Sequence, residues 1–231
     1  LAKSLALHHA RSGSAVVVDV RSGHILAIAS LPSFDPSRPG AVKPENWRLR
    51  PIQDAFEPGS TVKPFIAAAA LSADVIRSGE RFDCRDRGVS VAGHWVRDHA
   101  DPGLYTVDEV VIHSANAGII EMAERLSEDR LRRAFDAFGF GRRTGVAYPA
   151  EARGLLPEIR SWSKMSRAGF ALGQELTVSP LQMAMAYAAI GNGGWLLPPR
   201  IVMPDTASGA AAGRQERTRI LDEILASRLR A

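Results

Sequence analysis

The sequence predicts an α+β fold, because strand patterns and helix patterns occupy separate stretches of the chain. Two runs rich in β-branched and apolar residues, 14–20 and 24–30, are joined by Arg21, Ser22 and Gly23, a composition typical of a hairpin turn. Their nearly continuous apolar character predicts that both faces of this hairpin are covered. Short extended pieces are expected over 81–103, and helix signals dominate much of the rest.

Helix boundaries can be placed from capping residues. Ser60 follows the helix breakers Pro58 and Gly59 and precedes an alanine-rich run, so a helix is expected to start at Ser60. Thr106 and Glu109 form a capping-box pattern that opens a second helix. The full set of expected segments is a helix end over 1–11, a long loop over 32–54, helices over 106–113, 117–126, 129–138, 177–190 and 217–230, a loop over 145–166, and a mobile stretch over 207–213.

Ser60 and Lys63 form a candidate catalytic pair. Residues three apart lie on the same face of a helix, so the hydroxyl and the amine are expected to be neighbours at the helix start. A buried lysine with a lowered pKa can accept the proton of a serine, and free amides at a helix start can stabilise an oxyanion. The pair therefore indicates acyl-transfer chemistry through a serine nucleophile.

The Ser-x-x-Lys pattern is weak evidence by itself, because Ser161 and Lys164 also match it. We reject this second match, since no glycine precedes it and Gly169 leaves no room for a long helix. For Ser60, the competing interpretation is an ordinary helix start followed by a solvated lysine.

The composition describes a globular chain of 231 residues with 45% hydrophobic residues. The charge of +4 does not indicate a nucleic-acid partner, because only four of the 29 basic residues are lysines and the arginines are scattered. Cys84 is the only cysteine, and His94 and His99 lack a third ligand at a recognisable spacing. We therefore expect no disulfide, no metal and no cofactor.

Several stretches taken together resemble the transpeptidase domain of penicillin-binding proteins. The residues that carry the resemblance are 17–30, 31–36, 56–65, the triplet Ser114, Ala115 and Asn116, 138–145, 162–163 and 177–194, all in the order of that family. The Phe-Glu-Pro-Gly-Ser-Thr form is most similar to the monofunctional class B enzymes of septal peptidoglycan synthesis. The resemblance implies a β-lactamase/transpeptidase-like fold, in which an antiparallel sheet packs with helices beside a helical subdomain.

The resemblance also implies roles for four residues. Ser60 would be the acylated nucleophile, Lys63 its general base, Ser114 a proton relay and Asn116 a hydrogen-bonding partner of Lys63 and the substrate. The substrates would be peptidoglycan stem peptides, and β-lactams would trap Ser60. The implied location is the bacterial cell envelope, on the outer face of the cytoplasmic membrane, with proteins of cell division or cell-wall synthesis as partners.

One motif of the family is missing. None of the four lysines is followed by Thr-Gly or Ser-Gly, and Arg143-Thr144-Gly145 is rejected as a substitute because it lies in a glycine-rich loop. We therefore expect 1–231 to be part of a transpeptidase domain, without the anchor region and the last sheet strands, and with an exposed apolar face. Loss of one oxyanion donor costs about 10²–10³ in rate, so impaired activity is expected.

Two alternatives remain open at the level of the sequence. The first is a serine hydrolase of the same fold, either a D,D-carboxypeptidase or a β-lactamase. The second is a binding or scaffold protein that retains the fold without the chemistry.

Overall fold

The computed structural model describes residues 1–202 and 216–230. The α-helices are α1 (Ala2–Leu7), α2 (Arg50–Gln53), α3 (Lys63–Ser72), α4 (Val107–Ile112), α5 (Asn116–Glu124), α6 (Glu128–Ala137), α7 (Ser166–Ala171), α8 (Pro180–Gly191) and α9 (Glu223–Arg230). The strands are β1 (Gly13–Val18), β2 (Ile25–Leu31), β3 (Arg81–Asp83), β4 (Gly88–Val91), β5 (His94–Arg97), β6 (Leu104–Thr106), β7 (Trp195–Leu196) and β8 (Thr218–Arg219). These elements make the predicted α+β fold.

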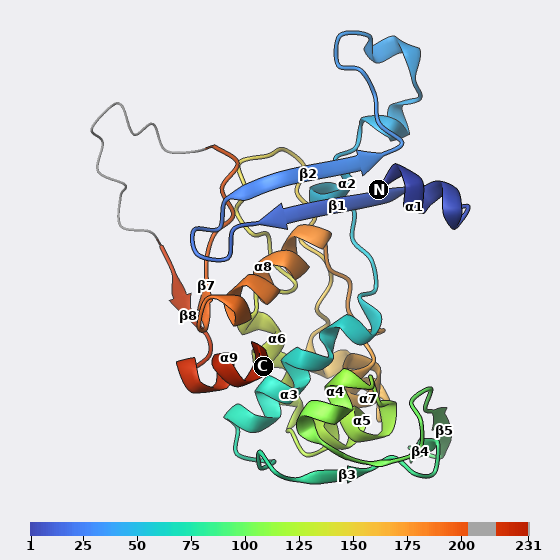
Figure 1. The fold of residues 1–231 in the computed structure, drawn as a ribbon, viewed down its shortest axis with the longest axis vertical. Coiled ribbons are helices and arrows are strands. Elements are labelled where there is room, and N and C mark those ends of the chain that lie inside the picture. The colour runs from blue at the N-terminus through green and yellow to red at the C-terminus, as the bar shows by residue number, and fades with distance from the viewer. Residues whose placement is uncertain (203–215, 231) are drawn as a thin grey trace.

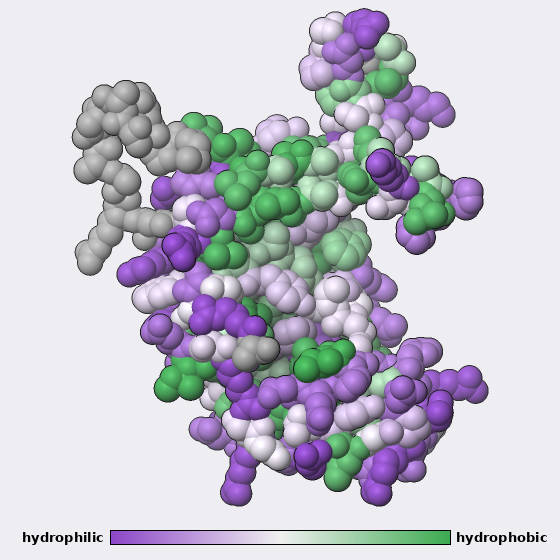
Figure 2. Space-filling view, in the orientation of Figure 1, coloured by the Kyte–Doolittle hydropathy of each residue, from purple (hydrophilic) through white to green (hydrophobic). Residues whose placement is uncertain are grey.

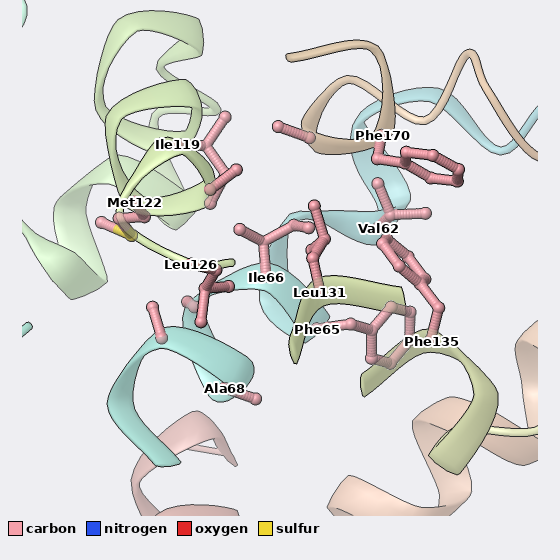
Figure 3. Close-up of a cluster of buried hydrophobic side chains, with 14 of the residues drawn as sticks. Val62, Phe65, Ile66, Ala68, Ile119, Met122, Leu126, Leu131, Phe135 and Phe170 are labelled. Carbon is pink, nitrogen blue, oxygen red and sulfur yellow. The ribbon is translucent and has the colours of Figure 1, made fainter. Parts of the chain in front are cut away.

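Helix α3 lies at the centre of the main hydrophobic core (Figure 1). One side of it meets α5, where Ile66 packs near Ile119 (Figure 3). The other side meets α6, and the ring centroid of Phe65 lies 4.6 Å from that of Phe138 and 5.4 Å from that of Phe140. The alanines of α3 allow this close approach of neighbouring helices, so the start of α3 is fixed by packing on several sides.

A second, smaller core joins the hairpin of β1 and β2 to α8. Its fully buried members are Ile52, Val146, Leu181, Met185 and Leu197. The strands are antiparallel, and the register pairs Val16 with Ile28 on the side that packs against this core. The predicted hairpin is therefore present. Every sheet in the described part of the chain has two strands.

The expectation that both faces of the hairpin are covered is wrong. Val17 and Leu26 are 51% and 63% exposed, whereas Val16 and Ile28 on the opposite face pack against the second core. The hydrophobic surface gathered over the hairpin is visible in Figure 2. An apolar run thus did not distinguish a strand packed on both faces from one packed on a single face.

Local capping signals were reliable. Thr106 accepts a hydrogen bond from the amide of Glu109, and the Glu109 carboxylate accepts one from the amide of Thr106, which completes the predicted capping box of α4. Ser179 and Gln182 form the same arrangement at the start of α8. Both helices begin at these caps because the side chains satisfy amides that have no partner within the helix.

Three boundaries differ from the prediction. Gly59–Val62 is a turn of 3-10 helix, so α3 itself starts at Lys63 and not at Ser60. The loop over 145–166 ends in α7, a helix that was not predicted. The C-terminal helix begins at Glu223, and β8 precedes it. The expected mobile stretch, 207–213, lies outside the described residues.

The long loop over 32–54 contains short helical turns, Pro39–Ala41, Pro44–Trp47 and α2. Prolines at the first positions of these turns favour a helical start, because the ring fixes φ near the helical value. Within the described residues, no helix combines the length and the apolar character that a membrane span requires.

Candidate active site

Ser60 lies in the 3-10 turn that leads into α3. Its side chain is exposed, and its hydroxyl makes no hydrogen bond within the described residues, whereas the neighbouring Thr61 hydroxyl donates to the carbonyl of Pro58 over 2.8 Å. The Ser60 carbonyl accepts the amide of Lys63, which makes the turn continuous with the helix. Ser60 is therefore held by its backbone, with its hydroxyl open to an incoming group.

Two contacts from outside α3 hold this turn in place. The hydroxyl of Tyr187, on α8, donates to the carbonyl of Thr61 over 2.8 Å. The amide of Gly59 donates to the carbonyl of Gly173 over 3.1 Å. Gly173 is at φ +70°, and a Cβ built there would lie 2.2 Å from the carbonyl oxygen of Gly59, so only glycine fits.

Lys63 is the largest fully buried polar side chain, with 1% of its surface exposed. Its Nζ donates to the carbonyl of Ser114 over 2.5 Å, to the hydroxyl of Ser114 over 3.0 Å and to the Oδ1 of Asn116 over 2.7 Å. These acceptors match the three hydrogens of an ammonium group. The structure thus brings Lys63, Ser114 and Asn116 together, one helical turn from Ser60.

The triplet 114–116 lies at the predicted joint between α4 and α5. Ser114 adopts φ +55°, a left-handed conformation that reverses the chain between the helices. Asn116 is the first residue of α5, and its Nδ2 donates to the carbonyl of Arg97 over 2.8 Å. With its amide group fixed at both ends, Asn116 presents Oδ1 to Lys63.

Burial lowers the pKa of Lys63 from 10.5 to about 8, although the negative charge of Asp98 acts in the opposite direction. Taking an ammonium out of water disfavours the charged form, and the carboxylate opposes that loss. The neutral amine, which can accept a proton, is therefore much more accessible near neutral pH than in a solvated lysine.

Asp98 was not among the residues singled out from the sequence. Its carboxylate is 9% exposed and accepts the amide of Ala117, in the first turn of α5, over 2.8 Å. The stretch around His94 and His99 was considered only as a metal site. No local sequence signal pointed to Asp98, because the amide that it accepts belongs to Ala117, 19 residues further along the chain.

The motifs rejected from the sequence make local contacts instead. Glu151, 7% exposed, accepts the amide of Thr144 over 2.7 Å and the amide of Gly145 over 3.2 Å. The hydroxyl of Ser161 donates to the carbonyl of Glu158 over 2.7 Å, and Lys164 is exposed. Both stretches thus have a structural explanation within their own loops.

Among the described residues, no group of three or more His, Cys, Asp or Glu side chains is arranged to hold a metal ion. Cys84 is buried, and burial raises the pKa of its thiol to about 11, so it is a poor nucleophile. The hydroxyl, amine and amide groups around Lys63 are the chemistry that this site offers.

Comparisons with known proteins identify the family of this chain. The sequence model described as "Penicillin binding protein transpeptidase domain" matches residues 13–224. Peptidoglycan D,D-transpeptidase FtsI of Escherichia coli K12 is 37% identical over 205 residues, which are 89% of this chain and 34% of FtsI. The chain spans about a third of the length of the curated relatives it matches.

Solved structures of this family have the same fold. The transpeptidase domain of Burkholderia pseudomallei penicillin-binding protein 3 superposes with a TM-score of 0.86 at 26% identity, covering 100% of this chain and 63% of that one. Penicillin-binding protein 3 of Mycobacterium tuberculosis, in complex with aztreonam, gives 0.85 at 31% identity, covering 99% and 52%. These matches confirm the transpeptidase-like fold and the resemblance to class B enzymes. The chain belongs to the penicillin-binding protein transpeptidase domain family.

Proposed function

We propose that this chain carries the acylation site of a peptidoglycan D,D-transpeptidase, in which Ser60 is the nucleophile. The observation that carries the proposal is the arrangement around Lys63: an amine that is 1% exposed, held by Ser114 and Asn116, one helical turn from an exposed serine. A lysine buried only for stability would be unfavourable, because taking an ammonium out of water costs several kcal/mol, which hydrogen bonds to neutral acceptors offset only in part.

Lys63 acts as the general base. In its neutral form the Nζ accepts the proton of the Ser60 hydroxyl while the serine oxygen attacks the carbonyl carbon of the substrate amide. The pKa of about 8 leaves a useful fraction of neutral amine near neutral pH. Free backbone amides at this helix start stabilise the negative charge that develops on the carbonyl oxygen.

Ser114 completes the first half-reaction. Its hydroxyl lies 3.0 Å from Nζ, so it can pass the proton from Lys63 to the nitrogen of the leaving group. The amide bond breaks, the amine leaves, and the acyl group remains as an ester on Ser60. Asn116 keeps Lys63 in position through its Oδ1 and offers its amide to the substrate backbone.

The proposed substrate is the D-alanyl-D-alanine end of a stem peptide, which loses D-alanine when Ser60 is acylated. An amine of a second stem peptide then attacks the ester and forms the cross-link. The relative from Escherichia coli is named for D,D-transpeptidase activity, which supports this substrate class. β-Lactams imitate the same end, in line with the relative that was solved with aztreonam.

We place this chemistry in the bacterial cell envelope, on the outer face of the cytoplasmic membrane, where peptidoglycan is assembled. Partners of cell division or cell-wall synthesis are proposed by analogy with the septal relatives. Neither the site nor the scattered arginines suggests nucleic acid as a partner.

Covalent labelling tests the proposal. A fluorescent penicillin should label the chain, and both Ser60→Ala and Lys63→Ala should lose the label. Ser163→Ala, a serine beside an exposed lysine, is the matched control and should label normally. Equal labelling of Ser60→Ala and the unaltered chain would refute the proposed nucleophile.

The same assay separates the two alternatives. A β-lactamase would release the label and turn over a chromogenic cephalosporin, whereas a transpeptidase site would keep the penicillin-derived acyl group on Ser60. A scaffold protein would bind penicillin reversibly or not at all. With a D-alanyl-D-alanine peptide as donor, a product that carries an added D-amino acid would support transfer, and the shortened peptide alone would support hydrolysis.

A further inference from the structure

The end of β5 and the residue that follows it contact the start of α5 twice. The carbonyl of Arg97 accepts the side-chain amide of Asn116 over 2.8 Å, and the carboxylate of Asp98 accepts the backbone amide of Ala117 over 2.8 Å. Consecutive residues of one segment therefore hold consecutive residues of the helix that carries the contact to Lys63.

Asp98 replaces a capping side chain that α5 lacks. The residue before the helix is Ala115, and no side chain of that position bonds to the helix amides. A free amide at a buried helix start is costly, and a carboxylate there also interacts favourably with the helix dipole. Asp98 supplies this acceptor from a distant segment.

The position of Asp98 is itself fixed. Its other carboxylate oxygen accepts the amide of Ala100 over 3.1 Å, and its own backbone amide donates to the carbonyl of Arg87 over 2.8 Å. Both oxygens are thus engaged, and the side chain is 9% exposed. A group held this rigidly can transmit its position to α5.

We propose that Asp98 is a positioning residue of the acylation site, which fixes the first turn of α5 so that Asn116 holds Lys63 in the geometry needed for catalysis. The expected effect on acylation rests on the proposed function, whereas the contacts of Asp98 with α5 do not. The side chain does not contact the reacting atoms; it acts through Ala117 and the adjacent Asn116.

The charge of Asp98 acts on the pKa of Lys63, so this pKa can be measured as an effect that loss of a packing contact alone would not produce. The titratable groups that act on Lys63 are Asp98 and the thiol of Cys84, which follows β3. Burial raises the pKa of that thiol to about 11, so Asp98 supplies the negative charge at working pH. Removing this charge must lower the pKa of Lys63 further below its present value of about 8.

Two substitutions separate position from charge. Asp98→Asn keeps one oxygen acceptor, for the amide of Ala117, but loses the charge and the acceptor for the amide of Ala100, whereas Asp98→Ala loses both acceptors and the charge. The matched control is Asp101→Asn, which removes a charge from an exposed residue of the same loop. The acylation rate with a penicillin is measured from pH 6 to pH 10 for each variant, together with the melting temperature.

We expect Asp98→Ala to lower the acylation rate about tenfold or more at every pH. Asp98→Asn should retain most of the acylation rate on the high-pH plateau of the profile. The midpoint of its pH–rate profile should lie lower than that of the unaltered chain by about half a pH unit or more. Asp101→Asn should match the unaltered chain. Equal rate losses in both Asp98 variants with an unmoved midpoint, or no loss in Asp98→Ala, would overturn the proposal.

A titration of Lys63 that needs no activity keeps this test separate from the proposed function. The chain has only four lysines, so the NMR signal of the Lys63 side chain can be assigned by its loss in Lys63→Gln. Its pKa should fall in Asp98→Asn and stay constant in Asp101→Asn. If Ser60→Ala labels normally but the pKa of Lys63 falls in Asp98→Asn, the proposed function fails and the link between Asp98 and Lys63 remains. If the pKa of Lys63 does not change in Asp98→Asn, that link is overturned.

Discussion

Lys63 and Asn116 are joined by a hydrogen bond of 2.7 Å between Nζ and Oδ1, although 53 residues separate them in the sequence. Helix α3 carries the lysine and α5 carries the asparagine, and these two helices pack against each other through the main core (Figure 3). The geometry of the polar site is therefore a consequence of apolar packing, and substitutions that shift either helix should act on the chemistry.

Replacements of Ser114 should separate the effect of backbone strain on stability from the effect of the hydroxyl on acylation. Ser114→Gly and Ser114→Ala both lose the hydroxyl that Nζ contacts and keep the backbone carbonyl, but only glycine adopts φ +55° without strain. Ser114→Gly should therefore be more stable than Ser114→Ala by about 1 kcal/mol in denaturant unfolding, while both acylate slowly. Equal stabilities would contradict the assignment of strain to this joint.

Gly173→Ala should damage the turn that carries Ser60. A Cβ there would overlap the carbonyl oxygen of Gly59 at 2.2 Å, so the turn must move. Gly145→Ala is the matched control, because Gly145 also has a positive φ, +81°, but open space around it. We expect both variants to lose about 1 kcal/mol of stability from the backbone and only Gly173→Ala to lose penicillin labelling.

The buried amine of Lys63 should make stability depend on pH. Its pKa is lowered from 10.5 in the unfolded chain to about 8 in the folded chain, so the unfolded state binds more protons between these values. The contribution of Lys63 to the unfolding free energy should rise by about 3 kcal/mol as the pH increases from 8 to 10.5.

The comparison with Lys63→Met isolates this contribution. The pKa of the Cys84 thiol is raised to about 11, so its contribution to the unfolding free energy falls over a similar pH range. Both proteins contain Cys84, so this contribution cancels in the difference between them. Denaturant unfolding of both proteins at pH 7.5, 9 and 10.5 measures the effect. A difference that stays constant with pH would show that Lys63 keeps an ordinary pKa.

The apolar outer face of the β1 and β2 hairpin should bind hydrophobic dyes and favour aggregation (Figure 2). Leu26, 63% exposed, lies on this face, and Leu26→Lys should lower dye fluorescence and slow aggregation on heating. Ile224→Lys on α9 removes a single exposed residue, 84% exposed, elsewhere. It should change the dye signal little. A sharp monomeric melt with low dye binding of the unaltered chain would rule out this expectation.

Local signals allowed much of the fold to be predicted. The capping box at Thr106, the hairpin turn and the joint at Ser114 depend on residues close together in the sequence, so their physical causes can be read there. Helix α7 was missed because its loop context and short length of 6 residues give a weak periodic signal.

Features that depend on distant contacts were harder to predict. The spacing of Ser60 and Lys63 indicated a reactive pair, but the association of Lys63 with Ser114 and Asn116 came from a family resemblance and not from the residues alone. Asp98 was missed because its partner, the amide of Ala117, belongs to another segment. The open face of the hairpin was missed because hydrophobicity along a strand does not say what lies above it.

The central claim is that Ser60, and not another serine beside a lysine, forms the acyl-enzyme. The most direct test is to treat the chain with a penicillin, digest it and locate the added mass by tandem mass spectrometry. We predict the adduct on the peptide that contains Ser60, and its absence in Lys63→Ala. An adduct on Ser161 or Ser163, next to the exposed Lys164, would contradict it.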